Sequence, residues 1–118
     1  WINSLINQTR SESTLRKERC EICNSKEDYF EGHHIAGRKH DFRQITVCKP
    51  CHDELSRKQK LRDIRWTEYN QSEYLRESFF LNGLYDILIL KSKKSSNFYY
   101  EKYAILLTED IAKRLKSK

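Results

Sequence analysis

The sequence predicts an α+β fold, in which a small metal-organised module is flanked by α-helices and followed by a helical C-terminal region. Two observations predict it. All four cysteines, all four histidines and the single proline fall within residues 20–56. After this unit, apolar residues recur at spacings of three to five, as in a buried helical stripe. With 118 residues, of which 37% are hydrophobic, the chain supports one domain with a modest core, and such domains often need a metal or a partner for stability.

The N-terminal arm, residues 1–19, is polar and irregularly patterned. Ser13 is a candidate cap for a short helix that leads toward Cys20. A basic segment followed by a long apolar stretch, typical of a signal peptide, is not visible there. The most apolar window, Phe79–Leu90, is interrupted by polar residues and is shorter than the ~20 residues that cross a bilayer. We therefore expect an intracellular, cytoplasmic protein.

Two short antiparallel strands are predicted within the metal-organised module, which spans residues 20–60. The apolar residues Tyr29, Phe30 and Ile35 predict the first strand. Ile45 and Val47 predict the second strand. A basic loop joins them, and a helix is expected after the second cysteine pair. The predicted order is strand, loop, strand, helix, with histidines on the first strand and at the start of the helix.

The remaining residues, 61–118, are predicted to be helical. Leu61 and Ile64 continue a helical pattern among basic residues, a second helix begins near Ser72, and a third follows the polar break at Lys91–Asn97. An alternative is a β-hairpin formed by residues 84–90 and 98–107. The apolar residues that carry the helical period are Tyr74, Leu75, Phe79, Phe80, Leu84, Ile87, Leu88, Tyr99, Tyr103, Leu106, Leu107, Ile111 and Leu115.

The four cysteines form two CxxC pairs, Cys20–Cys23 and Cys48–Cys51. A CxxC turn directs two thiolates toward one point, and two such turns complete a tetrahedral Cys₄ zinc site. Two disulfides would suit a secreted protein, and a redox motif would use only one pair. Four buried free thiols would not favour this spacing. The pattern therefore predicts a structural zinc ion, whose binding energy would also be folding energy.

The adjacent pair His33 and His34 lies on the first predicted strand, and His52 directly follows Cys51. Adjacent strand residues point to opposite faces, so one histidine can bind metal while the other faces water. The alternative is that both are partly exposed strand residues without a metal. The combination of these histidines with two CxxC turns favours a metal-binding site over the alternative.

This segment resembles the HNH endonuclease family, in the form where a zinc knuckle supports a ββα-metal fold. The motifs that carry the resemblance are CEIC, EGHHIAG and ITVCKPCH, within residues 20–56. The family pattern is a CxxC, a pair of histidines followed by an aliphatic residue, an asparagine, and a CxxCH. The resemblance implies that His33 and His52 bind a catalytic divalent metal, such as Mg²⁺ or Mn²⁺. It also implies that His34 is the general base that takes a proton from the attacking water.

The sequence departs from the family pattern at the asparagine. The corresponding position, five residues before Cys48, is Arg43, and Gln44 follows it. In the family this asparagine braces the loop and orients the base. Gln44 and Asp41 are the residues available for that role here. Ser56, one helical turn after His52, is at best a weak additional ligand.

Positive charge predicts where a nucleic acid would bind. The chain carries 23 Lys+Arg against 17 Asp+Glu, a net charge of +6, which suits a polyanionic partner. A basic run at residues 57–65 is also compatible with an ordinary solvated helix face. His40 is expected to be solvated or to contact phosphate, and Trp66 is expected to pack in the core rather than to stack on a base. The predicted contacts to nucleic acid are Arg38, Lys39, Arg43, Arg57 and Lys58.

The predicted function is that of a metal-dependent DNA endonuclease with structural zinc, although RNA is a possible substrate. The alternative is a zinc-stabilised DNA-binding or assembly module that has lost catalysis, which the missing asparagine favours. A zinc module that binds only proteins would leave the paired histidines and the net charge unexplained. The aromatic density of the C-terminal helices exceeds what a small core needs, and it predicts a homodimer through these helices.

Overall fold

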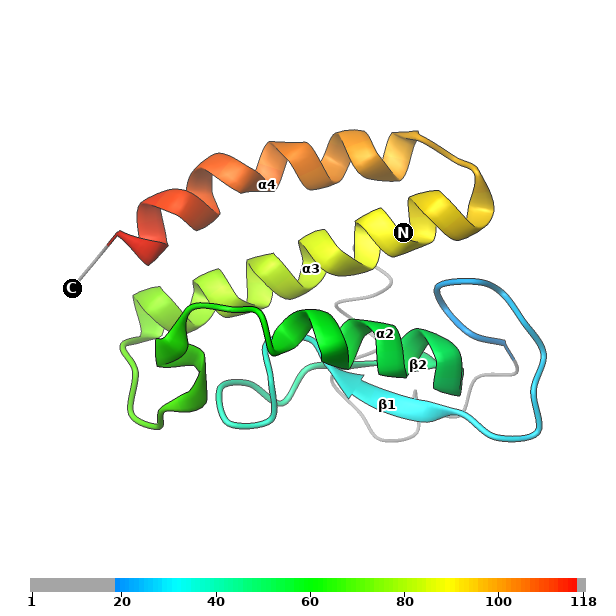
Figure 1. Ribbon diagram of the computed structural model, residues 1–118, viewed down its shortest axis with the longest axis horizontal. Coiled ribbons are helices and arrows are strands. Elements are labelled where there is room, and N and C mark those ends of the chain that lie inside the picture. Colours follow the sequence, from blue (N-terminus) through cyan, green and yellow to red (C-terminus); the bar gives the residue numbers. More distant parts are fainter. Residues whose placement is uncertain (1–18, 117–118) are drawn as a thin grey trace.

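The computed structural model describes residues 19–116 and has a mixed α+β architecture (Figure 1). Its central element is the long helix α3 (Glu73–Ser95), which lies between α4 (Tyr99–Leu115) and a lower layer. The lower layer contains a two-stranded sheet and the helix α2 (Lys49–Gln59). The predicted fold class is confirmed at this level, and the predicted helix capped by Ser13 lies outside the described residues.

The two predicted strands are present as an antiparallel hairpin, with β1 at Glu31–His34 and β2 at Gln44–Val47. His33 pairs with Ile45, and His34 pairs with Gln44. Each strand is only four residues long, and an isolated hairpin of this size is marginally stable in water. The hairpin must therefore be supported by its surroundings.

Support for the loop between the strands comes from Trp66, on the short 3₁₀ helix η2 (Ile64–Thr67). The indole Nε1 of Trp66 donates a hydrogen bond to the carbonyl oxygen of Ala36 at 2.9 Å. Gly37 has a φ angle of 108°, and a Cβ there would lie 2.6 Å from the same indole nitrogen. The backbone conformation and the close approach both require glycine at this position. Core packing was the expectation for Trp66, and its contacts confirm it.

Helix α2 begins directly after Cys48 with Pro50 in its first turn, where proline is tolerated because the missing N–H would have no partner there. Its buried residues Cys51, Leu55 and Gln59 are four apart and form one helical face. The helix ends at Gln59, so the prediction that Leu61 continues the helical pattern is wrong, and Ile64 begins the separate 3₁₀ helix η2. These two side chains are 83% and 75% exposed.

The inward-facing residue after α2 is Arg62 instead. Its side chain is only 3% exposed, and its guanidinium lies 3.0 Å from the carboxylate of Asp86 on α3. A buried charge needs an opposite charge nearby, and this pair turns the chain so that its neighbours Leu61 and Ile64 face solvent. Arg62 was grouped with the basic run in the sequence, but in the fold it belongs to the interior.

Helix α3 has the start that the sequence predicts, because the Ser72 hydroxyl accepts a hydrogen bond from the amide of Leu75 at 3.2 Å. It packs closely on the exit of β1. A Cβ at Gly83 would lie 2.0 Å from the carbonyl oxygen of Ile35, so glycine allows the helix to touch the hairpin backbone. The helix ends at Ser95, and its C-cap Ser96 adopts the left-handed conformation with φ 57°.

Helix α4 packs along α3 and buries Ala104 and Ile111. The helices over residues 73–95 and 99–115 exclude the alternative β-hairpin there. Within the described residues, no helix has the length and apolarity needed to cross a membrane.

We expect Gly83→Ala to destabilise the protein by ~1–3 kcal/mol, because the added methyl group would overlap a backbone oxygen that cannot rotate away. Urea unfolding of the two proteins, each with its metal content matched, measures the difference. Lys93→Ala, at an exposed position of the same helix, is the control and should leave the midpoint nearly unchanged. Equal midpoints for Gly83→Ala and the unsubstituted chain would contradict the close approach.

Candidate metal and active centre

The four cysteines of the two CxxC pairs come together at one point of the fold. Their sulfur atoms all lie within 4.8 Å of one another, and Cys23 Sγ is 3.6 Å from Cys48 Sγ. Four thiolates around a zinc ion, each at about 2.3 Å, would lie roughly 3.8 Å apart. The cluster is therefore compatible with a structural metal such as zinc, and the cysteines are not joined as disulfides.

Hydrogen bonding within the cluster already favours a thiolate. The hydrogen bond from Cys51 lowers the pKa of Cys20 to about 4, although burial opposes it. The pKa of Cys51 is raised by the same hydrogen bond and by burial. The two groups therefore share one proton in the metal-free arrangement, and a bound metal would displace it.

Two lysines of α3 bring positive charge to this cluster. Lys94 Nζ lies 3.2 Å from Cys51 Sγ, and Lys91 Nζ donates to the carbonyl oxygen of Glu21 at 2.6 Å. Burial lowers the pKa of Lys94, but the hydrogen bond to Cys51 and the nearby thiols outweigh burial and raise it. A Cys₄ site with a divalent ion carries a net negative charge, so these ammonium groups are suited to stabilise it.

A second cluster lies between β1 and the start of α2. The rings of His33 and His52 are 5.7 Å apart between centroids and nearly perpendicular. Glu31, two residues before His33, places a carboxylate oxygen 3.0 Å from Nδ1 of His52. Glu31, His52 and Asp53 each offer one ligand atom within 4.8 Å of the others. The structure thus brings His52 together with two carboxylates, while the ring of His33 lies near that of His52 but its nitrogens stand outside this set of ligand atoms.

His33 is 3% exposed and is neutral at physiological pH. Burial, followed by the positive charge of His52 and Arg62, lowers its pKa to about 3. A neutral imidazole is the form that binds metals. The cluster therefore contains one histidine that is ready to bind a metal without first losing a proton.

Gln59 holds the backbone beside this histidine. Its amide nitrogen donates to the carbonyl oxygens of His34 at 2.9 Å and Ile35 at 3.3 Å. An amide nitrogen has two hydrogens, so both are used by these carbonyls. The remaining contact, 3.5 Å from Gln59 Nε2 to His33 Nε2, is too long to occupy the imidazole lone pair. A metal could use that nitrogen after a small movement of the amide.

His34 ends β1 and is half-buried beside the loop that follows. Burial, and then the positive charge of Arg38, lower its pKa below the ordinary value, while Asp41 opposes the shift. His34 is therefore unprotonated at neutral pH, as a general base must be. It is not part of the Glu31–His52–Asp53 cluster.

Arg43, which occupies the position of the asparagine in the family pattern, is held by contacts with residues other than His34. Arg43 forms an ion pair with Asp41, lies 3.7 Å from Glu77 and stacks over the ring of Phe80 at 3.4 Å. The hydrogen bonds from Arg43 keep the pKa of the Asp41 carboxyl below its usual value despite burial. Gln44 faces His34 across the hairpin register, which makes it the closer substitute for the asparagine.

His40 differs from the sequence-based expectation of a solvated or phosphate-contacting residue. It is 7% exposed, its Nε2 lies 2.6 Å from the carbonyl oxygen of Trp66, and its ring is 4.8 Å from Phe79. It therefore serves as a buried structural residue that ties the hairpin loop to η2 and α3. The reason is that the loop folds back onto α3 rather than into solvent.

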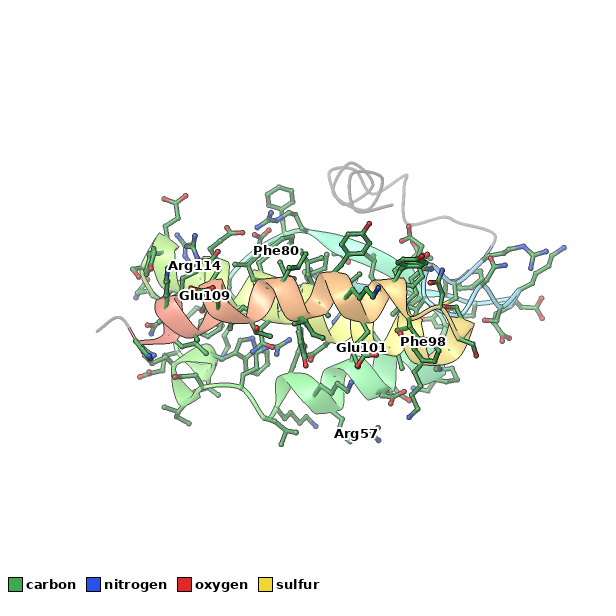
Figure 2. The ribbon with its side chains drawn as sticks, turned by 90° about the horizontal axis from the view of Figure 1, so that it is seen from above. Arg57, Phe80, Phe98, Glu101, Glu109 and Arg114 are labelled. Atoms are coloured by element: carbon green, nitrogen blue, oxygen red, sulfur yellow. The ribbon has the colours of Figure 1, made fainter. Side chains whose placement is uncertain are left out.

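The predicted nucleic-acid contacts fall into two places. Arg38 and Lys39 are exposed residues of the hairpin loop. Lys39 donates to the carbonyl oxygen of Thr67 at 2.8 Å and lies over the ring of Tyr69. Arg57 and Lys58 lie on α2, and Arg57 extends from the outer edge of the molecule in Figure 2. Arg43 is held by its ion pairs, so it is the least available of the five.

Sequence reasoning missed Glu31 and Gln59. A signal for each was present: Glu31 shares a strand face with His33 because side chains alternate along a strand. Gln59 follows His52 by two helical turns, so it lies on the same side of α2. Ser56, considered as a weak ligand, lies on the same helix, one turn after His52.

No family model matches this chain, and neither the curated proteins nor the solved structures include a significant match.

Chelation of the metal should unfold the hairpin module, because metal binding of this kind supplies about 10–16 kcal/mol in small Cys-rich domains. We expect one zinc ion per chain by elemental analysis, and a large fall in the melting temperature after removal. Cys48→Ala should reproduce the loss. His52→Ala is the control, because it lies one residue from Cys51 but should keep the zinc ion and the fold. An unchanged melting temperature without metal would contradict a structural role.

Proposed function

We propose that this protein is a metal-dependent endonuclease of HNH type that hydrolyses phosphodiester bonds in DNA. The observation that carries the proposal is the pairing of buried His33 with His52, 5.7 Å apart between ring centroids, next to a neutral His34. This histidine set lies beside a four-cysteine cluster, in the order that the resemblance predicts. RNA remains a possible substrate, because nothing in the set distinguishes the two sugars.

In this proposal the four cysteines hold a structural zinc ion, and His33 and His52 hold a catalytic divalent ion. The fit rests on the buried neutral imidazole of His33 and on His52, whose buried Nδ1 makes no aligned hydrogen bond although Glu31 Oε2 lies 3.0 Å from it. A bound divalent cation such as Mn²⁺ or Mg²⁺ would neutralise charge on the phosphoryl group and on the leaving oxygen.

His34 has the role of general base. Its imidazole accepts a proton from the water that attacks the phosphorus atom in line with the leaving oxygen. In this proposal Gln44, which pairs with His34 in the hairpin register, orients that imidazole. Arg38 raises the positive charge near His34 and favours the approach of a phosphate.

A second candidate function is supported by one specific observation. Arg43, at the position of the family asparagine, forms ion pairs with Asp41 and Glu77. Its guanidinium can only donate hydrogen bonds, whereas the amide of an asparagine both donates and accepts them. Without a residue that braces the base, the chain would be a zinc-stabilised DNA-binding or assembly module. The arginine would then contribute charge rather than catalysis.

A supercoiled-plasmid assay separates the two functions. We expect metal-dependent nicking that EDTA abolishes, and a loss of 100-fold or more in His34→Ala, since general bases contribute about 10²–10⁴ in rate. Zinc content and circular dichroism verify that this variant is folded. His40→Gln, at a buried histidine outside the proposed site, is the matched control and should keep the activity if it folds. DNA binding without cleavage under every metal would support the second candidate.

We also propose that two copies associate through α4, so that two nicking sites can act on opposite strands. One side of α4 carries the exposed side chains Tyr99, Tyr103 and Leu106. If two such helices pair antiparallel about Leu106, Lys102 lies opposite Asp110 of the partner subunit. The face is thus apolar at its centre and complementary in charge on both sides, as a two-fold interface requires.

Light scattering after size-exclusion chromatography tests the association. We expect a mass of twice the 14.3 kDa chain, and a shift toward the monomer in Leu106→Asp, because a charge would be buried at the centre of the interface. Thr108→Asp adds the same charge at an exposed position off this face and should remain dimeric. A monomeric parent chain at micromolar concentration would exclude this interface.

A further inference from the structure

We infer that Glu31 is a third ligand of the cation held by His33 and His52, and that this set selects a transition-metal dication over Mg²⁺. The inference rests on the proposed function for the existence of that cation. It adds a residue that the sequence resemblance does not assign, and it replaces the open choice of divalent ion by a chemical class.

The side chains of Glu31 and His52 lie in an unusual contact. Oε2 of Glu31 and Nδ1 of His52 are 3.0 Å apart, yet each is sealed from solvent and without a hydrogen-bond partner. The two atoms are therefore close but not aligned as donor and acceptor. Buried polar atoms without hydrogen bonds are rare and costly, and a cation bound by both atoms would satisfy the carboxylate oxygen and the imidazole nitrogen together.

His33 lies close to both of these side chains in the fold. Glu31 and His33 are two residues apart on β1, so they share one face of the strand. The ring of His33 meets that of His52 edge to face at 5.7 Å, and the contact from Gln59 Nε2 to His33 Nε2 is long, at 3.5 Å. The nitrogens of His33 stand outside the set of Glu31, His52 and Asp53 atoms within 4.8 Å of one another, so a small movement of the ring would accompany binding of a shared cation. One strand and the first turn of one helix thus supply two imidazoles and one carboxylate to the same region.

Asp53 is the competing carboxylate. Its Oδ1 lies 3.5 Å from His52 Nδ1, but its side chain is 56% exposed and is engaged by Lys49 at 3.4 Å. An exposed carboxylate already paired with a lysine is a weaker ligand than the carboxylate of Glu31, whose side chain is 23% exposed and whose Oε2 is sealed from solvent. We therefore assign the third ligand to Glu31 and leave Asp53 outside the set.

The ligand types decide the class of metal. Two imidazoles and one carboxylate suit Mn²⁺, Fe²⁺, Co²⁺ or Zn²⁺, and leave open positions for water and phosphate oxygens. Mg²⁺ prefers oxygen ligands and gives up its water reluctantly. The site should therefore bind Mn²⁺ more tightly than Mg²⁺, whatever substrate is present.

The test measures metal binding directly, without a nuclease assay. The protein is first loaded with one equivalent of zinc in the cysteine site, and Mn²⁺ is then titrated while free Mn²⁺ is followed by electron paramagnetic resonance. We expect one Mn²⁺ per chain, a loss of affinity of tenfold or more in Glu31→Gln, and little change in Asp53→Asn. Mg²⁺ should displace Mn²⁺ only at a large excess.

Circular dichroism and zinc content establish that Glu31→Gln is folded. His52→Ala is the second variant and should abolish the Mn²⁺ signal. Unchanged Mn²⁺ affinity in Glu31→Gln, a larger loss in Asp53→Asn, or equal affinity for Mg²⁺ would overturn the inference. Mn²⁺ bound through Glu31 without any cleavage of DNA would uphold this inference and refute the proposed nuclease, so the two failures are distinguishable.

Discussion

The convergence of four cysteine sulfurs is the constraint on which the rest of the structure depends. The two CxxC pairs lie at the two ends of the hairpin segment, and their sulfurs all lie within 4.8 Å of one another. Closing a loop costs conformational entropy, and the pairing of two four-residue strands is too weak to offset that cost. The free energy of binding a metal to the four thiolates would offset it, and the bound metal would fix the hairpin to the start of α2.

Helix α3 is the second support, and it reaches both clusters. At one end Lys94 contacts Cys51. In its middle, Gly83 allows the helix backbone to touch Ile35 at the exit of β1, and Asp86 pairs with the buried Arg62. Because the same helix packs against the cysteine cluster and against the strand of the histidine pair, displacement at one cluster would be transmitted to the other.

The candidate active site illustrates why buried polar groups are informative. An interior usually satisfies its polar atoms with hydrogen bonds, but at the junction of β1 and α2 Oε2 of Glu31 and Nδ1 of His52 lie 3.0 Å apart without an aligned hydrogen bond. His33 beside them is held neutral by burial. Elsewhere in the described residues the buried histidine His40 has a firm partner. The contrast separates a histidine that supports the fold from histidines that are available for binding.

The types of the elements follow from the sequence alone, because apolar residues at helical intervals predict the two C-terminal helices. The spacing of the two CxxC pairs likewise predicts that the four cysteine sulfurs meet at one place. The sequence also identified the candidates His33, His34 and His52. Only the tertiary structure decided which polar residues turn inward. Arg62 replaces Leu61 in the interior because Asp86 of α3 is there to pair with it, and His40 is buried because the hairpin loop folds onto α3. Glu31 became a candidate ligand for the same reason. His52 is distant from it in the sequence, and the two side chains meet only because α2 packs on β1.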